Sequence, residues 1–64
     1  MKEPNYTREE IEQVGESYIN GNISWVKKAI DKRQKLFIEV CYYIYDIYGT
    51  EKMFKFMDII HRGL

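Results

Sequence analysis

The sequence predicts an all-α protein, a small bundle of three or four short helices around a central hydrophobic helix at about residues 32–48. Apolar residues recur every three or four positions through most of the chain, as they do on one face of a helix. No asparagine–glycine turn lies between alternating apolar runs, so a β-hairpin is not indicated. With 64 residues the chain can form one domain, residues 1–64, in which we expect residues 1–6 to be a flexible lead.

The first helix is expected to begin just after Thr7. Thr7 and Glu10 have the spacing of a capping box, in which each side chain binds the other residue's backbone amide. Tyr6 and Ile11 occupy the two positions of a hydrophobic staple. The predicted end lies at residues 19–21, where an asparagine and a glycine follow the last apolar position.

This first helix is predicted to be amphipathic. Ile11, Val14 and Tyr18 share its apolar face, on which Gly15 would let another helix approach closely. Paired carboxylates on the opposite face can bind metals or transfer protons, but no histidine accompanies them there. We therefore interpret this acidic face as solvated. It consists of Glu9, Glu12 and Glu16.

A second helix is predicted from Asn22 or Ser24 onward, and where it ends is open. Asp31 and Gln34 have the spacing of a second capping box, which favours a break and a new helix at 32–48. The alternative is one continuous helix over 23–48, because the apolar stripes of both parts stay in phase. Such a helix would span about 39 Å. We favour the break, because a compact chain of this size has a radius of gyration of about 11 Å.

The fourth helix is predicted to follow at once. Gly49 is expected to end the central helix, and Thr50 to cap the next one. Charged residues alternate with an apolar stripe in the amphipathic pattern, and Ile59 is an exception on the charged side. The stripe consists of Met53, Phe56, Met57, Ile60 and Leu64.

The central helix has two apolar sides. One arc is predicted to form the core and consists of Leu36, Val40, Tyr43, Ile44 and Ile47, extended by Phe37, Cys41 and Tyr48. Ile38, Tyr42 and Tyr45 form a separate flank, with the spacing of an anchor row for a partner helix. Two interpretations remain: the fourth helix covers this flank, or the flank is an interface. We favour a homodimer interface, because a chain this small without a disulfide or a zinc cage needs additional burial.

Charge is balanced overall but unevenly distributed. Residues 1–22 are acidic on balance and residues 23–35 are basic, so the two segments can attract each other within the fold. The basic segment, with an aromatic beside it, is also a candidate contact for nucleic acid or a small anionic ligand. Zero net charge and the interrupting Asp31 count against broad nucleic-acid binding. The candidate residues are Trp25, Lys27, Lys28, Lys32, Arg33 and Lys35.

Catalysis is not predicted. Cys41 and His61 are the one nucleophile and the one base of the usual kind, and Cys41 lies on an apolar helix face, where cysteine is typically an inert core residue. We expect no catalytic residue, no metal site and no cofactor. The longest wholly apolar run, Cys41–Tyr45, is far shorter than the ~20 residues that cross a bilayer. With no signal peptide visible, we expect a cytoplasmic protein without a membrane partner.

The stretch Tyr18–Val26, followed by Tyr48-Gly49 and an aromatic amphipathic tail, resembles small uncharacterised proteins of tailed bacteriophages. The resemblance carries over no functional residue. It implies a protein that acts in the bacterial host cytoplasm, where small phage proteins often bind and inhibit or redirect a host factor. The sequence thus predicts a non-enzymatic, homodimeric interaction module, with a host protein as a further partner. A nucleic-acid or anionic-ligand binder is the alternative.

Overall fold

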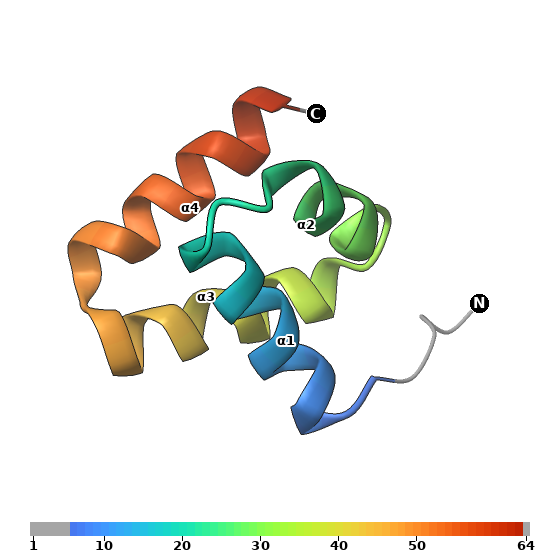
Figure 1. Cartoon of the computed structure of the whole chain (residues 1–64), viewed down its shortest axis with the longest axis horizontal. Helices are drawn as coiled ribbons and strands as arrows, with labels where there is room; N and C mark the ends of the chain where they lie inside the picture. The colour runs from blue at the N-terminus through green and yellow to red at the C-terminus, as the bar shows by residue number, and fades with distance from the viewer. Residues whose placement is uncertain (1–5, 64) are drawn as a thin grey trace.

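The structure, a computed structural model that describes residues 6–63, consists of four α-helices joined by short connections (Figure 1). The helices are α1 (Arg8–Ile19), α2 (Ile23–Ile30), α3 (Gln34–Tyr48) and α4 (Thr50–Gly63). No strand occurs in the described residues, which confirms the all-α prediction. The predicted central helix, α3, contacts each of the other three helices. Figure 1 shows α1 crossing α3 and α4 turning back from the C-terminal end of α3.

The start of α1 follows the sequence prediction in part. The hydroxyl of Thr7 accepts the amide of Glu10 at 3.2 Å, so half of the capping box is confirmed. The Glu10 carboxylate binds Arg33 instead of returning to Thr7. Tyr6 and Ile11 are both half-buried and pack against the core. Tyr6 is therefore packed, and the rest of the expected flexible lead lies outside the described residues.

The break between α2 and α3 is present, and the continuous helix is wrong. The Cα radius of gyration is 10.7 Å, as expected for a compact chain. The second capping box does not form, because Asp31 lies at the end of α2 and α3 begins only at Gln34. Lys32 has a φ of 59°, a left-handed conformation that interrupts the helical path. Lysine does not signal such a conformation, so the sequence placed this start two residues early.

A single residue, Gly49, separates α3 from α4. Its φ of 99° is one that glycine adopts without strain, and its amide reaches the carbonyls of Ile44 and Tyr45. Thr50 is the first residue of α4 and not its cap, a shift of one position from the prediction. Ile59 is half-buried, and the predicted contact of Leu64 lies outside the described residues.

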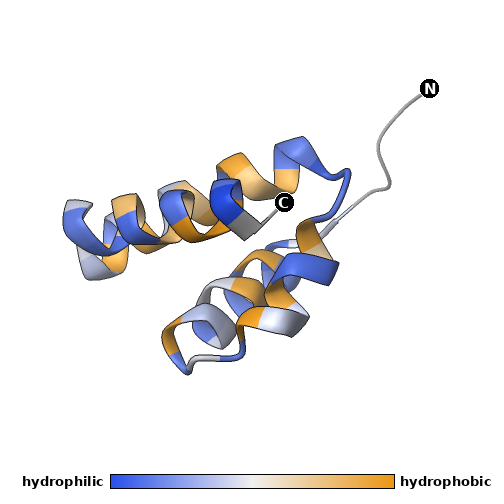
Figure 2. Ribbon diagram, turned by 90° about the horizontal axis from the view of Figure 1, so that it is seen from above, coloured by the Kyte–Doolittle hydropathy of each residue, from blue (hydrophilic) through white to orange (hydrophobic). Residues whose placement is uncertain are grey.

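Phe56 is at the centre of the core and is fully buried. Its ring meets that of Tyr18 edge-on at 5.0 Å and stacks on that of Phe37 at 5.6 Å, so α1, α3 and α4 join there. Orange and blue positions alternate along the ribbons in Figure 2, as they do in amphipathic helices. The buried core consists of Val14, Val26, Ile30, Leu36, Val40, Cys41, Ile44, Phe56 and Ile60.

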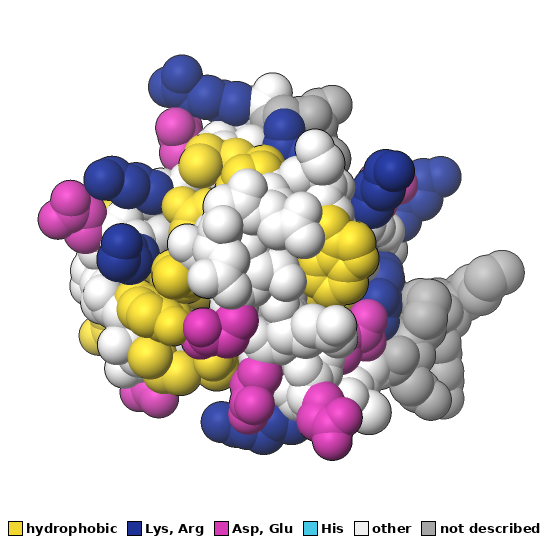
Figure 3. All heavy atoms as spheres, viewed as in Figure 1, with side chains coloured by type: hydrophobic (Ala, Val, Ile, Leu, Met, Phe, Trp, Pro, Cys, Tyr) yellow, Lys and Arg dark blue, Asp and Glu magenta, His cyan; other side chains and the backbone are white. Residues whose placement is uncertain are grey.

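One predicted core residue is wrong. Ile47 is 53% exposed, although it shares the direction of Leu36 and Ile44 around α3. A helical wheel gives the direction of a side chain but not how far the covering helices extend, and Ile47 lies in the last turn of α3. In the view of Figure 3, hydrophobic side chains gather over the corner where α3 meets α4, and charged side chains surround the molecule. Within residues 6–63, no helix combines the length and apolar character needed to cross a lipid bilayer.

Candidate functional site

The flank of α3 is exposed. Ile38, Tyr42 and Tyr45 are 44%, 65% and 51% accessible to solvent. The interpretation that α4 covers this flank is therefore wrong. Because α4 returns after a single residue, it lies along the neighbouring side of α3, where Phe56 stacks on Phe37. The flank begins beyond that contact.

Phe54 enlarges the exposed surface, although its position in the sequence does not predict this. It is 59% exposed and lines a groove of about 310 Å³ between α3 and α4, together with Ile38 and Tyr42. Its signal in the sequence is an aromatic residue one position beyond Met53, outside the apolar stripe of α4. The remaining lining of the groove is also apolar: Phe37, Cys41, Met53 and Met57.

We call Ile38, Tyr42, Tyr45 and Phe54 the apolar patch. Three rings that are each about half exposed or more, with an isoleucine beside them, present apolar surface on the order of 400 Å². That area is within the range of the largest patches on monomeric proteins, and such patches often mark interaction sites. Tyrosine suits a surface of this kind, since its hydroxyl can remain in water while its ring is buried.

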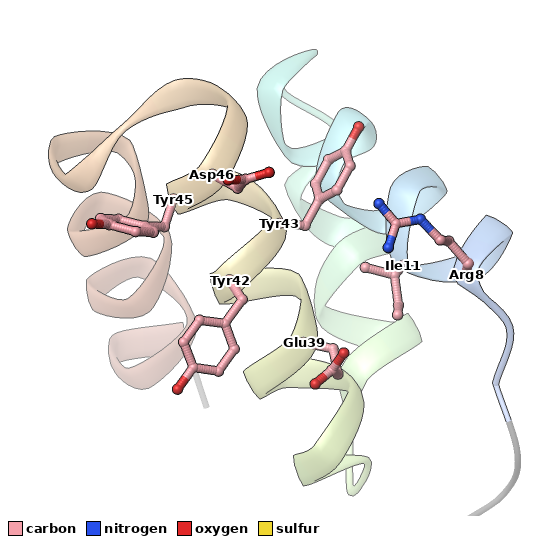
Figure 4. Close-up of a pocket in the computed structure, with 7 residues that line it drawn as sticks. All are labelled: Arg8, Ile11, Glu39, Tyr42, Tyr43, Tyr45 and Asp46. Carbon is pink, nitrogen blue, oxygen red and sulfur yellow. The ribbon is translucent and has the colours of Figure 1, made fainter.

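The other side of the patch has a polar border. A second hollow, of about 370 Å³, lies between α1 and α3 (Figure 4). In Figure 4, Tyr43 points toward α1, whereas Tyr42 and Tyr45 point away from it. The carboxylates of Glu39 and Asp46 lie on the α1 side of α3, so the patch is apolar toward α4 and acidic toward α1. The lining residues are Arg8, Ile11, Glu39, Tyr42, Tyr43, Tyr45 and Asp46.

The acidic face is solvated at Glu9 and Glu12, which are exposed, but Glu16 is half-buried and bound to α3, which corrects the sequence interpretation for this one residue. Its Oε2 accepts the hydroxyls of Tyr43 at 2.8 Å and Tyr48 at 2.6 Å. These hydrogen bonds, first that of Tyr48 and then that of Tyr43, hold the pKa of Glu16 below its usual value. The bond to Glu16 raises the pKa of Tyr43 to about 12. The network joins α1 to α3 on the side away from the apolar patch.

Gly15 leaves room for the ring of Tyr43 at this contact between α1 and α3. A Cβ at Gly15 would lie 2.7 Å from Cε2 of Tyr43 and closer still to Cδ2, so the ring occupies the space of a missing side chain. The close approach at Gly15 is made by an aromatic ring of α3, whereas the sequence predicts the approach of a helix. The sequence contains no local signal for which side chain of the fold would lie over Gly15.

Arg33, from the basic segment, pairs with the acidic α1. Its Nη1 and Nη2 donate to the two carboxylate oxygens of Glu10 at 2.8 and 2.9 Å. The pair confirms the predicted attraction between the two segments, and the arginine bond lowers the pKa of Glu10. Lys32 and Arg33 line one hollow with His61, and Trp25 is not among its lining residues. Of the six candidate residues, this hollow brings together only Lys32 and Arg33. Trp25, Lys28, Lys32 and Lys35 are exposed, and Lys27 is half-buried.

Cys41 and His61 differ in their surroundings. Cys41 is 8% exposed, and burial raises the pKa of its thiol to about 11. The thiol is therefore protonated near neutral pH and is a poor nucleophile. His61 is exposed, with its ring edge-on to Phe37 at 6.1 Å. Across residues 6–63, no three histidine, cysteine or acidic side chains come together in an arrangement that could hold a metal ion.

Comparisons with protein-family models, with curated proteins and with solved structures find no match to the chain. Within residues 6–63, the apolar patch holds three of the four exposed large aromatic side chains, Tyr42, Tyr45 and Phe54, and the fourth is Trp25.

Proposed function

We propose that the protein is a non-enzymatic interaction module that forms a homodimer through the apolar patch. The observation that supports this most directly is the exposure of Tyr42, Tyr45 and Phe54, three aromatic side chains grouped on one surface. Their rings would leave water in a dimer, and this burial is favourable in proportion to the apolar area covered. Aromatic residues also dominate the centres of protein interfaces.

A second copy is the occupant that best fits the size of the patch and of the chain. A standard interface covers about 800 Å² on each partner, so a patch on the order of 400 Å² would form its apolar centre within a polar rim. A chain of 64 residues without a disulfide gains the most from such burial, because small domains are marginally stable alone. A twofold axis lets one patch serve both partners.

The basic segment gives less support for a second function, as a nucleic-acid or anionic-ligand binder. Arg33, its one side chain with a planar fork for phosphate, is paired with Glu10. The resemblance to phage proteins makes a host protein the competing occupant of the apolar patch. In that case the isolated chain would be monomeric.

Light scattering after size exclusion tests the proposal. The chain has a mass of 7.8 kDa, and we expect about twice that mass at micromolar concentration. Ile38→Glu and Tyr45→Glu should restore the monomer while the helical circular dichroism is kept. Ile47→Glu is the matched control, since Ile47 is on the same helix and 53% exposed but lies outside the patch. A monomeric wild type, or dimer loss in the control as well, would overturn the proposal.

A further inference from the structure

We infer that the two copies pack with their α3 helices antiparallel and with the two Tyr42 side chains next to the twofold axis. This inference rests on the proposed homodimer and specifies its geometry. It follows from two features of the apolar patch, namely the spacing of its residues along α3 and the different chemistry of its two borders.

The spacing allows the row to pair with a reversed copy of itself. Ile38 and Tyr45 are seven residues, about 10 Å, apart, and the midpoint of the row falls between Cys41 and Tyr42. Reversal about this midpoint places Ile38 against the partner's Tyr45 at both ends. At the centre, Tyr42 lies beside the partner's Tyr42. A parallel pair would instead place each residue against its own equivalent, so spacing alone does not decide the direction.

The borders of the row decide whether the two α3 helices run antiparallel or parallel. On the α4 side are Phe54 and the apolar groove, and on the α1 side are the carboxylates of Glu39 and Asp46, with Arg8 in the lining of the same hollow. When the twofold axis is perpendicular to α3, each border faces the same border of the partner. When the axis is parallel to α3, each α4 border faces the partner's acidic border.

The parallel arrangement would therefore press carboxylates against apolar surface. Glu39 and Asp46 would lose water next to the partner's Phe54, and burying an ionised carboxylate without a partner is costly. In the antiparallel arrangement, the two apolar borders meet. The two acidic borders meet as well, but in the rim, where water and the Arg8 side chains of the same hollow offset the repulsion between carboxylates. The chemistry of the patch thus favours the antiparallel dimer.

Phe54 gains a role in this arrangement. It lines the same groove as Ile38 and Tyr42, so it lies close to the middle of the row and thus close to the axis. The apolar groove of about 310 Å³ beside it is open to receive a side chain of the partner. Phe54 is therefore expected to be a second anchor of the dimer, contributed by α4.

Cysteine cross-linking distinguishes the two directions. In a Cys41→Ala background, Tyr42→Cys should form a disulfide-linked dimer on mild oxidation. Ile38→Cys and Tyr45→Cys should each fail to link with themselves but should link when the two variants are mixed, because a disulfide needs Cα atoms within about 7 Å. Ile47→Cys, outside the patch, should not link. Self-linking of Ile38→Cys and of Tyr45→Cys would establish the parallel arrangement and overturn the inference.

A second measurement leaves the patch intact. Gln34 is exposed at the start of α3, and spin labels on Gln34→Cys, again with Cys41→Ala, report the distance between the two helix starts. The antiparallel dimer separates them by about 22 Å along the helix direction, whereas a parallel dimer brings them within the width of a helix pair, about 10 Å. A short distance between the two spin labels overturns only the antiparallel arrangement and leaves the proposed dimer in place. A monomer in light scattering overturns the proposed dimer as well, so the two failures are distinguishable.

Discussion

Tyr42 and Tyr43 are neighbours on α3, yet they have opposite surroundings. Tyr43 is half-buried, its ring lies over Gly15, and its hydroxyl donates to Glu16. Tyr42 is 65% exposed and borders two open hollows. The two side chains differ by one position, which turns them about 100° apart around the helix.

The difference shows that the apolar surface of α3 has two parts, one that packs within the chain and one that is exposed. On the side of Tyr43, α1 supplies a space without a side chain and a carboxylate for the hydroxyl, so the ring is bound within the chain. On the side of Tyr42, no described helix lies over the ring. Ring area on that side is thus available to a second molecule. Variants that exchange or remove these surroundings test the division.

The largest expected effect separates the core side of α3 from its flank. Ile44 is fully buried and Ile38 is 44% exposed, and both are isoleucines on the same helix. Ile44→Ala should lower the free energy of unfolding by about 2–5 kcal/mol, because it removes buried methyl groups and leaves a cavity. For a chain of this size that is a large share of the total stability. Urea unfolding followed by circular dichroism measures it.

Ile38→Ala is the matched control and should depend on protein concentration. If Ile38 lies in a dimer interface, its truncation lowers stability where the wild type is dimeric and has little effect where it is monomeric. The loss of unfolding free energy in Ile44→Ala should be the same at a protein concentration where the wild type is dimeric and at one where it is monomeric. Equal, concentration-independent losses in the two variants would contradict the division of α3 into a core side and an interface side.

A smaller effect is expected at the seam between α1 and α3. Gly15→Ala would normally stabilise a helix interior by up to about 1 kcal/mol. Here the added methyl group meets the ring of Tyr43, and such overpacking costs about 1–3 kcal/mol. We therefore expect a net loss of stability in urea unfolding. In a Tyr43→Ala background the same substitution should become stabilising, and a loss in both backgrounds would show that the ring is not the cause.

The sequence predicts the helices well because their signals are local. The cap at Thr7, the stop at Gly49 and the apolar periods all lie within a few residues of the boundary that they determine. The sequence predicts the start of α3 two residues early, because this start depends on the left-handed conformation of Lys32, for which lysine gives no local signal. It also predicts Ile47 in the core, because periodicity gives the direction of a side chain but not the reach of neighbouring helices.

The candidate site was only partly predictable for the same reason. Ile38, Tyr42 and Tyr45 form a row on one helix, so their spacing revealed them. Phe54 belongs to another helix, and its place beside the row depends on how α4 packs on α3. The bonds from Tyr43 and Tyr48 to Glu16 and from Arg33 to Glu10 likewise join positions far apart in the chain. Periodicity within one helix carries no information about such pairs.

The smallest expected effect is a pH dependence that belongs to the side of Tyr43 alone. Glu16 has a pKa below 4.5 in the folded chain, so its contribution to stability is present above about pH 4.5 and is lost as the pH falls through the folded pKa. Tyr43 has a pKa raised from 10.0 to about 12, so its contribution is present below pH 10 and is lost as the pH rises toward 12.

The difference in unfolding free energy between wild type and Glu16→Gln should therefore be level between these limits and shrink on both sides. Urea unfolding across the pH range measures this difference. Glu10→Gln should shrink its difference only on the acid side, because Glu10 binds an arginine and no tyrosine. The difference in unfolding free energy between wild type and Glu16→Gln should shrink above pH 10. If it did not, the hydrogen bonds of Tyr43 and Tyr48 would not distinguish the two sides of α3 in solution.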